Sequence, residues 1–191
     1  MKEKSSILSF ESASKWEEWL SKNYNKSEGI RLRIYKKGSE KISVTYVDAL
    51  YEALCYGWID GQKDKYDDES WLQKFTPRRP GSIWSKNNTK HVERLIKAGK
   101  MKPEGFKEVE KAKLDGRWEK AYESARTIAM PEDFLTKLNK NQKAKAFFDT
   151  LNKANTYAIA WRLHNAKKPE TRKKRMKTFI EMLAKGEKLH P

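Results

Sequence analysis

The stretch that decides the fold of the N-terminal half is IRLRIY at residues 30–35. Isoleucine, leucine and isoleucine alternate here with arginine, arginine and tyrosine. Because successive side chains of a strand point to opposite faces of a sheet, this alternation predicts a strand with one buried face and one face toward solvent. The turn KGS at residues 37–39 follows, and it predicts a short return strand over residues 42–44.

Helix signals lie on both sides of this strand. Ser14 and Glu17 have the spacing of a capping box, and two tryptophans and a leucine then fall on one helical face. Thr45 and Asp48 repeat that spacing before a second apolar stripe, which Gly57 is expected to end. The sequence therefore predicts one helix before the strand and one after it.

Strand signals continue at residues 58–60 and 70–75 and stop after the proline-rich loop at residues 76–81. The N-terminal part is therefore predicted to be a small α+β unit with three or four strands. Beyond the loop, apolar residues recur at helical spacing and no further strand is expected. Helices are predicted near residues 86–98, 103–116, 118–125, 131–138, 144–151, 154–161 and 169–186.

The predicted fold class is α+β, in two parts. Residues 1–82 are expected to form the small α+β unit, and residues 83–191 a basic helical part that packs on it, because no flexible linker separates them. Aromatic residues make up 12% of the chain and supply large pieces of core. The expected core side chains are Trp16, Trp19, Ile30, Leu32, Leu50, Leu54, Phe147, Trp161, Phe179 and Leu183.

The charge of the chain is large and unevenly distributed. The formal net charge is +16, with 36% of residues charged. Residues 1–82 hold 15 Lys and Arg against 13 Asp and Glu, whereas residues 83–191 hold 27 against 13. Such asymmetry points to an acidic partner, either nucleic acid, another polyanion, an anionic membrane face or an acidic protein. The alternative is that a lysine-rich surface only keeps the protein soluble.

Cysteine and histidine usage argues against a metal or disulfide. The single cysteine, Cys55, excludes an internal disulfide and a cysteine-based zinc site, and we expect it to be a small buried side chain. No histidine has a second histidine four residues away. We therefore expect no cofactor. The sequence shows neither a secretory signal nor a run long enough to span a membrane, so a cytoplasmic location is expected.

Three motifs carry a resemblance to a known family. They are ALCYGWIDG at residues 53–61, FTPRRPGSIWSKNN at 75–88 and AKKPETRKKR at 166–175. With them, the chain resembles the YdeI/OmpD-associated, or bacteriocin-protection, proteins over residues 16–186. The resemblance implies a stress role in tolerance of cationic antimicrobial peptides and an association with an outer-membrane porin. It supplies no reaction, cofactor or catalytic residue.

The second motif contains the first candidate site, for an anion. A loop fixed by prolines and glycine precedes a predicted helix, whose N-terminus offers free backbone N–H groups to a phosphate or carboxylate. The candidate ligand-binding residues are Arg78, Arg79, Ser82, Ser85, Lys86 and Asn87. The alternative is an ordinary capped helix whose arginines pair with Asp60 or with the acidic turn at residues 67–69.

The second candidate site is the basic segment at residues 167–177, which holds seven basic residues. Lys168, Arg172 and Arg175 are the candidate anion-binding residues. Helical spacing puts both arginines near the apolar stripe, while the lysines at 173, 174 and 177 point outward. Positive charge at a helix start opposes the macrodipole, so either an anionic partner or internal acidic residues are expected to stabilise it. The alternative is a solvated face with one internal arginine pair.

Function is expected to lie in binding. The leading hypothesis is a non-enzymatic stress-tolerance protein with a basic surface for nucleic acid or a phosphorylated small molecule. The second is an enzyme acting on a small anionic substrate, with Arg78 and Arg79 as clamps and Asp60 as acid or base. The third is an interaction module for an acidic protein. An enzyme needs a concave pocket with a titratable group beside the arginines, whereas a polyanion binder needs an exposed basic face.

Overall fold

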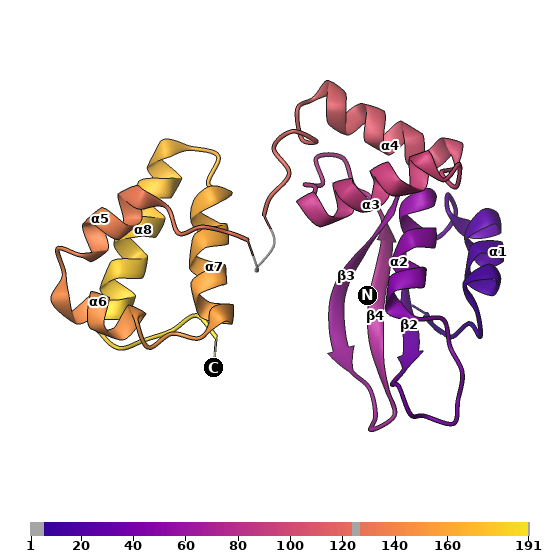
Figure 1. Cartoon of the computed structure of the whole chain (residues 1–191), viewed down its shortest axis with the longest axis horizontal. Helices are drawn as coiled ribbons and strands as arrows, with labels where there is room; N and C mark the ends of the chain where they lie inside the picture. Colours follow the sequence, from indigo (N-terminus) through magenta and orange to yellow (C-terminus); the bar gives the residue numbers. More distant parts are fainter. Residues whose placement is uncertain (1–5, 124–126, 191) are drawn as a thin grey trace. The chain divides into compact units, whose positions relative to one another are not determined.

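The computed structural model describes residues 6–123 and 127–190. It has a four-stranded mixed sheet with helices in the N-terminal half and only helices in the C-terminal part, which confirms the predicted α+β class (Figure 1). The chain forms two compact units: unit 1 comprises Met1–Trp84 and Asn88–Ala121, and unit 2 comprises Ser85–Asn87 and Tyr122–Pro191. The expected division into domains at residue 82 stays a prediction.

The sheet of unit 1 is built around β2 (Ile30–Tyr35) and β4 (Ser70–Pro77). Its strand order is β1-β2-β4-β3, where β1 is Ile7–Leu8 and β3 is Trp58–Lys65. β1 runs parallel to β2, and the other two pairings are antiparallel. Every second residue of β2 is buried, as the alternation predicts.

The prediction of a short return strand at residues 42–44 is wrong. Ile42 is 76% exposed, and the described backbone there is irregular. Val44 is buried, but its N–H donates to the carbonyl of Phe10 and not to β2. β2 instead pairs along its whole length with β4, from Ile30 opposite Phe75 to Tyr35 opposite Ser70. On β2, the N–H of Tyr35 donates to the hydroxyl oxygen of Ser43 at 2.9 Å, so this segment meets β2 through a side chain and not through a backbone ladder.

Helices α1 (Ala13–Asn23) and α2 (Tyr46–Cys55) supply the apolar side chains that cover the sheet of unit 1 (Figure 1). Thr45 caps α2 as predicted: its hydroxyl oxygen accepts from the N–H of Asp48 at 3.2 Å. The cap of α1 is Ser12, two residues before the predicted Ser14, and it accepts from the N–H of Lys15. The corner after α2 depends on Gly57, whose φ of 73° lies in the left-handed region that favours glycine.

Helices α3 (Lys86–Lys97) and α4 (Pro103–Leu114) begin and end close to the predicted residues. Their buried side chains, among them Val92 and Val109, share one core with the sheet. α4 packs so closely on α2 that a Cβ on Gly105 would lie 2.3 Å from the carbonyl oxygen of Cys55. The helix expected at residues 118–125 does not form over the part that is described, and Ala125 lies outside the described residues.

Unit 2 has a core of its own, made by helices α5 (Glu132–Leu138), α6 (Gln142–Phe148), α7 (Lys153–His164) and α8 (Pro169–Ala184). The most deeply buried side chains in this core are Phe134, Leu138, Ala144, Ile159, Leu163 and Leu183.

Seven of the ten expected core side chains are buried: Trp16, Ile30, Leu32, Leu50, Leu54, Phe179 and Leu183. The other three are only partly buried: Trp19, Phe147 and Trp161.

Candidate functional site

The loop between β4 and α3 uses its first arginine inside the fold. Arg78 is only 7% exposed, and its guanidinium carbon lies 3.4 Å from the centroid of the Trp84 ring. Its Nη1 donates to the carbonyl of Ile83 at 3.3 Å, and its backbone N–H donates to the carbonyl of Gly57 at 3.0 Å. A buried guanidinium stacked on an indole fixes the shape of the loop. These contacts join the two N-terminal family motifs.

The remaining loop residues are distributed between the two units. Arg79 is exposed, and its carbonyl accepts from the N–H of Ser82 at 2.9 Å, closing a turn. The carbonyl of Ser82 accepts from Arg117 at 2.7 Å. Ser85, Lys86 and Asn87 group with unit 2.

Lys86 is engaged at both its backbone and its side chain. Its N–H donates to the carbonyl of Tyr122 at 2.9 Å, and its ammonium pairs with Glu123. Ser85 forms an isolated parallel bridge with Tyr122, and Asn87 is exposed on the first turn of α3. Ser85 and Lys86 thus have partners within the protein.

Asp60, the alternative acid or base, lies in β3 opposite Phe75. Its carboxylate accepts from the hydroxyl of Tyr46 at 2.8 Å, and its side chain is partly buried. The pair of Tyr46 and Asp60 ties the start of α2 to the sheet. Arg78 contacts Ile83 and Trp84, and the pairing of the loop arginines with Asp60 stays a prediction.

The first arginine of α8 is an internal one. Arg172 donates from Nη2 to Oδ1 of Asp133 at 2.7 Å, from Nε to Oδ2 of Asp133 at 3.2 Å, and from Nη1 to the carbonyl of Leu163 at 2.7 Å. This fork fits the planar guanidinium and joins α5, α7 and α8. The hydrogen bonds from Arg172 lower the pKa of Asp133 below its ordinary value.

The second arginine of α8 likewise points into the unit. Nη1 of Arg175 donates to the carbonyl of Arg162 near the end of α7 at 2.5 Å. Lys168 is exposed and precedes α8 at the N-cap position without a side-chain cap. The arginines thus brace helices, and the lysines between them are the residues that face solvent, as the helical spacing predicts.

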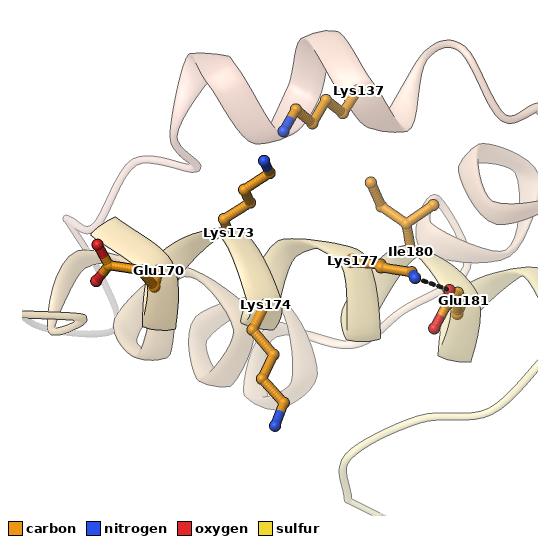
Figure 2. A pocket seen from close by; sticks show the side chains of 7 residues that line it. All are labelled: Lys137, Glu170, Lys173, Lys174, Lys177, Ile180 and Glu181. Carbon is orange, nitrogen blue, oxygen red and sulfur yellow. Dashed lines mark ion pairs between the residues drawn. The ribbon is translucent and has the colours of Figure 1, made fainter. Parts of the chain in front are cut away.

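A groove of about 670 Å³ lies between α5 and α8 of unit 2 (Figure 2). Its lining combines four lysines with two glutamates and one isoleucine: Lys137, Lys173, Lys174, Lys177, Glu170, Glu181 and Ile180. Figure 2 shows the ammonium ends of Lys137 and Lys173 pointing toward one another across the groove, whereas Lys174 points away from α5. The volume is in the range of small-molecule binding sites.

The charges of this groove are incompletely compensated. Lys177 pairs with Glu181 at 3.7 Å, on adjacent turns of α8. No ion pair joins Lys137, Lys173 or Lys174 to a carboxylate among the described residues. Like-charged ammonium groups that converge repel one another, so an anion between them would be stabilised. None of the sequence-predicted arginines lines the groove.

Lys137 is the residue that sequence reasoning missed. It belongs to a seven-residue helix 36 positions before Lys173, and only the packing of α5 on α8 brings the two together. The outward lysines of α8 are visible in the sequence by their helical spacing. A lysine at the end of α5 has no such local signal.

Other chemistry has no comparable cluster in the part of the chain that the structure describes. Within those residues, no group of three or more His, Cys, Asp or Glu side chains is arranged to hold a metal ion. None of the described helices is long and apolar enough to cross a membrane. Burial raises the pKa of the Cys55 thiol to about 12, which keeps it protonated.

Over the described residues, this protein combines an α+β unit that has a four-stranded sheet with a unit of four helices. Residues 8–108 match the family described as a domain of unknown function, DUF8412, and the chain belongs to that family. Residues 127–186 match the family described as bacteriocin-protection, YdeI or OmpD-associated, so unit 2 carries that domain. Comparison with curated proteins and with solved structures gave no match.

These matches confirm the resemblance to the bacteriocin-protection family and restrict it to residues 127–186. The motif at residues 166–175 lies in the bacteriocin-protection domain, whereas those at 53–61 and 75–88 lie in the part that the other family model covers. The groove between α5 and α8 therefore belongs to the bacteriocin-protection domain.

Proposed function

We propose that this protein is a non-enzymatic binding protein with a stress-tolerance role, which binds a phosphate-bearing polyanion in the groove between α5 and α8. The observation that carries the proposal is the convergence of Lys137 and Lys173 in a groove whose lysines outnumber its glutamates four to two. The cytoplasmic location expected from the sequence is part of the same proposal.

The charge around the groove supports the proposal. Residues 122–191 hold 16 Lys and Arg against 7 Asp and Glu, and this positive field draws anions to the unit. Arg172 and Arg175 are hydrogen-bonded to Asp133 and to backbone carbonyls, so they hold α8 in place while the lysines take the ligand. Candidate contacts thus move from the arginines to Lys137, Lys173 and Lys177.

The test is binding of a labelled single-stranded oligonucleotide by fluorescence anisotropy across a salt series, together with inorganic triphosphate by calorimetry. We expect at least one of these ligands to bind, with an affinity that falls linearly with the logarithm of salt concentration. The variant with Lys137→Glu and Lys173→Glu should weaken binding about tenfold or more, because two attractive contacts become repulsive.

The matched control is Lys143→Glu with Lys188→Glu, which changes the net charge equally at two exposed lysines outside the groove. It should reduce affinity only through the weaker overall field. Equal losses in the two variants would show that charge alone, without the groove, attracts the anion. Failure of both ligands to bind at low salt would overturn the proposal and leave the positive charge as a solubility feature.

A further inference from the structure

We infer that the ligand of this groove is compact, a small molecule with two or more phosphates and an apolar body, of the nucleoside di- or triphosphate class. The inference rests on the proposed function and decides between its two sources of phosphate, a nucleic-acid strand and a small molecule. Two features of the groove carry it: the order of charges along α8 and the apolar material beneath the ammonium groups.

Among the residues of α8 that line the groove, the lysines are bounded at both ends by acids. Residues 170, 174, 177 and 181 follow one another at helical spacing, so Glu170 and Glu181 stand at the two ends of a stripe with Lys174 and Lys177 between them. At 1.5 Å per residue the two glutamates are about 16 Å apart along the axis, and the lysines occupy only the middle turns.

This bounded pattern suits a short anion better than a polymer. A nucleic-acid strand laid along α8 advances about 3.4 Å per phosphate, so over this length it would bring phosphates opposite both glutamates. Those end contacts are repulsive. A di- or triphosphate fits between Lys137 of α5 and Lys173 of α8, while Lys177 stays paired with Glu181 and Glu170 lies beyond the other end of the ligand.

The apolar part of the ligand has a surface to rest on. Ile180 lines the groove one turn after Lys177, and the aliphatic stems of the lysines form most of the remaining wall. Figure 2 shows the stems of Lys137 and Lys173 extended, with their ammonium ends toward one another. A base or other flat apolar group would be buried against Ile180 and these stems while its phosphates lie between the ammonium groups, which is the arrangement of small-ligand sites.

The experiment compares four ligands on the full chain by calorimetry at one salt concentration: ATP, inorganic triphosphate, inorganic phosphate, and a short DNA duplex. We expect ATP to bind at least as tightly as triphosphate, phosphate to bind about a hundredfold more weakly, and the duplex to be displaced by ATP. The double variant Lys137→Glu with Lys173→Glu should weaken the affinity for ATP about tenfold or more. The control variant Lys143→Glu with Lys188→Glu should retain most of the wild-type affinity.

A second pair of variants tests the bounding acids. In Glu170→Gln with Glu181→Gln, affinity for duplex DNA should rise by a larger factor than affinity for ATP, because only the longer ligand reaches both ends. A wild-type protein that binds the duplex through Lys137 and Lys173 and is not displaced by ATP would overturn the inference and leave the proposed function standing. Absence of binding by every ligand would overturn both.

Discussion

Asn155 in α7 holds the C-terminal tail of unit 2, and its replacement gives a sharp test of the packing. The side chain is 1% exposed and makes four hydrogen bonds. Oδ1 accepts from the N–H groups of Leu189 and His190 at 3.0 and 2.9 Å, while Nδ2 donates to the carbonyl of His190 at 3.3 Å and to Asn152 at 3.0 Å. Both polar atoms of this buried amide are therefore satisfied.

Asn155→Ala removes all four bonds and leaves the tail unanchored. A hydrogen bond contributes about 0.5–1.5 kcal/mol net, and the tail amides regain water when they detach. The expected loss is therefore about 2–3 kcal/mol of unfolding free energy, below the simple sum. Urea denaturation followed by circular dichroism measures it, and hydrogen exchange should show faster exchange at the Leu189 and His190 amides.

The matched control is Asn139→Ala, an exposed asparagine at the end of α5, which should change stability by less than about 0.5 kcal/mol. Deleting residues 189–191 removes three of the four groups that the Asn155 side chain binds, so Asn155→Ala in that background should cost clearly less than in the full chain. Equal losses of stability in both backgrounds, or unchanged hydrogen exchange at the Leu189 and His190 amides, would refute the role of Asn155 in holding the tail.

Three further predictions concern packing and titration. Gly105→Ala should lower the free energy of unfolding by about 1–3 kcal/mol, because the new Cβ would meet the carbonyl of Cys55. Gly61→Ala, whose Cβ would have no neighbour closer than 3.7 Å, should leave stability unchanged. Urea denaturation midpoints measure both effects, and a more stable Gly105 variant would contradict the packing of α4 on α2. Cys55, with its pKa raised to about 12, should react with a disulfide reagent at pH 8 only after unfolding, and rapid labelling of the native protein would show the thiol to be accessible. Arg172 lowers the pKa of Asp133, so the pair stabilises the fold above about pH 4 and loses that contribution as the pH falls through the lowered pKa. Asp133→Asn should therefore be less stable than the wild type at pH 7, and the difference in stability should disappear in acid. A difference in stability that does not depend on pH would contradict the role of this pair.

Much of the fold follows from local patterns in the sequence. The alternation of β2 places Ile30 and Leu32 in the core, and the cap at Thr45 starts α2. Pro103 and Pro169 begin α4 and α8 as predicted, and both helices end two residues before the glycine expected to stop them. The same helical spacing separates the inward Arg172 from the outward Lys173. Each of these depends on residues within two turns or one strand, which is the range over which propensity and periodicity act.

Local sequence patterns predict only part of the candidate site. The lysines of α8 stand in one segment, but the loop at residues 78–87 also carries basic residues, and no local pattern distinguishes an arginine stacked on Trp84 from one that faces a ligand. The distinction is made by burial. Arg78 lies under an indole that arrives later in the chain, so its charge is used within the fold.

The sequence by itself determined the α+β class, the positions of most helices, the excess of positive charge and the family resemblance. Tertiary structure alone decided that β2 pairs with β4 across the sheet, that Asn155 binds a tail 34 residues away, and that Lys137 faces Lys173. The physical reason is the range of the interactions. Caps and amphipathic faces are set by neighbours a few residues apart, whereas strand partners, clamps and grooves depend on which distant surfaces bury the most apolar area together.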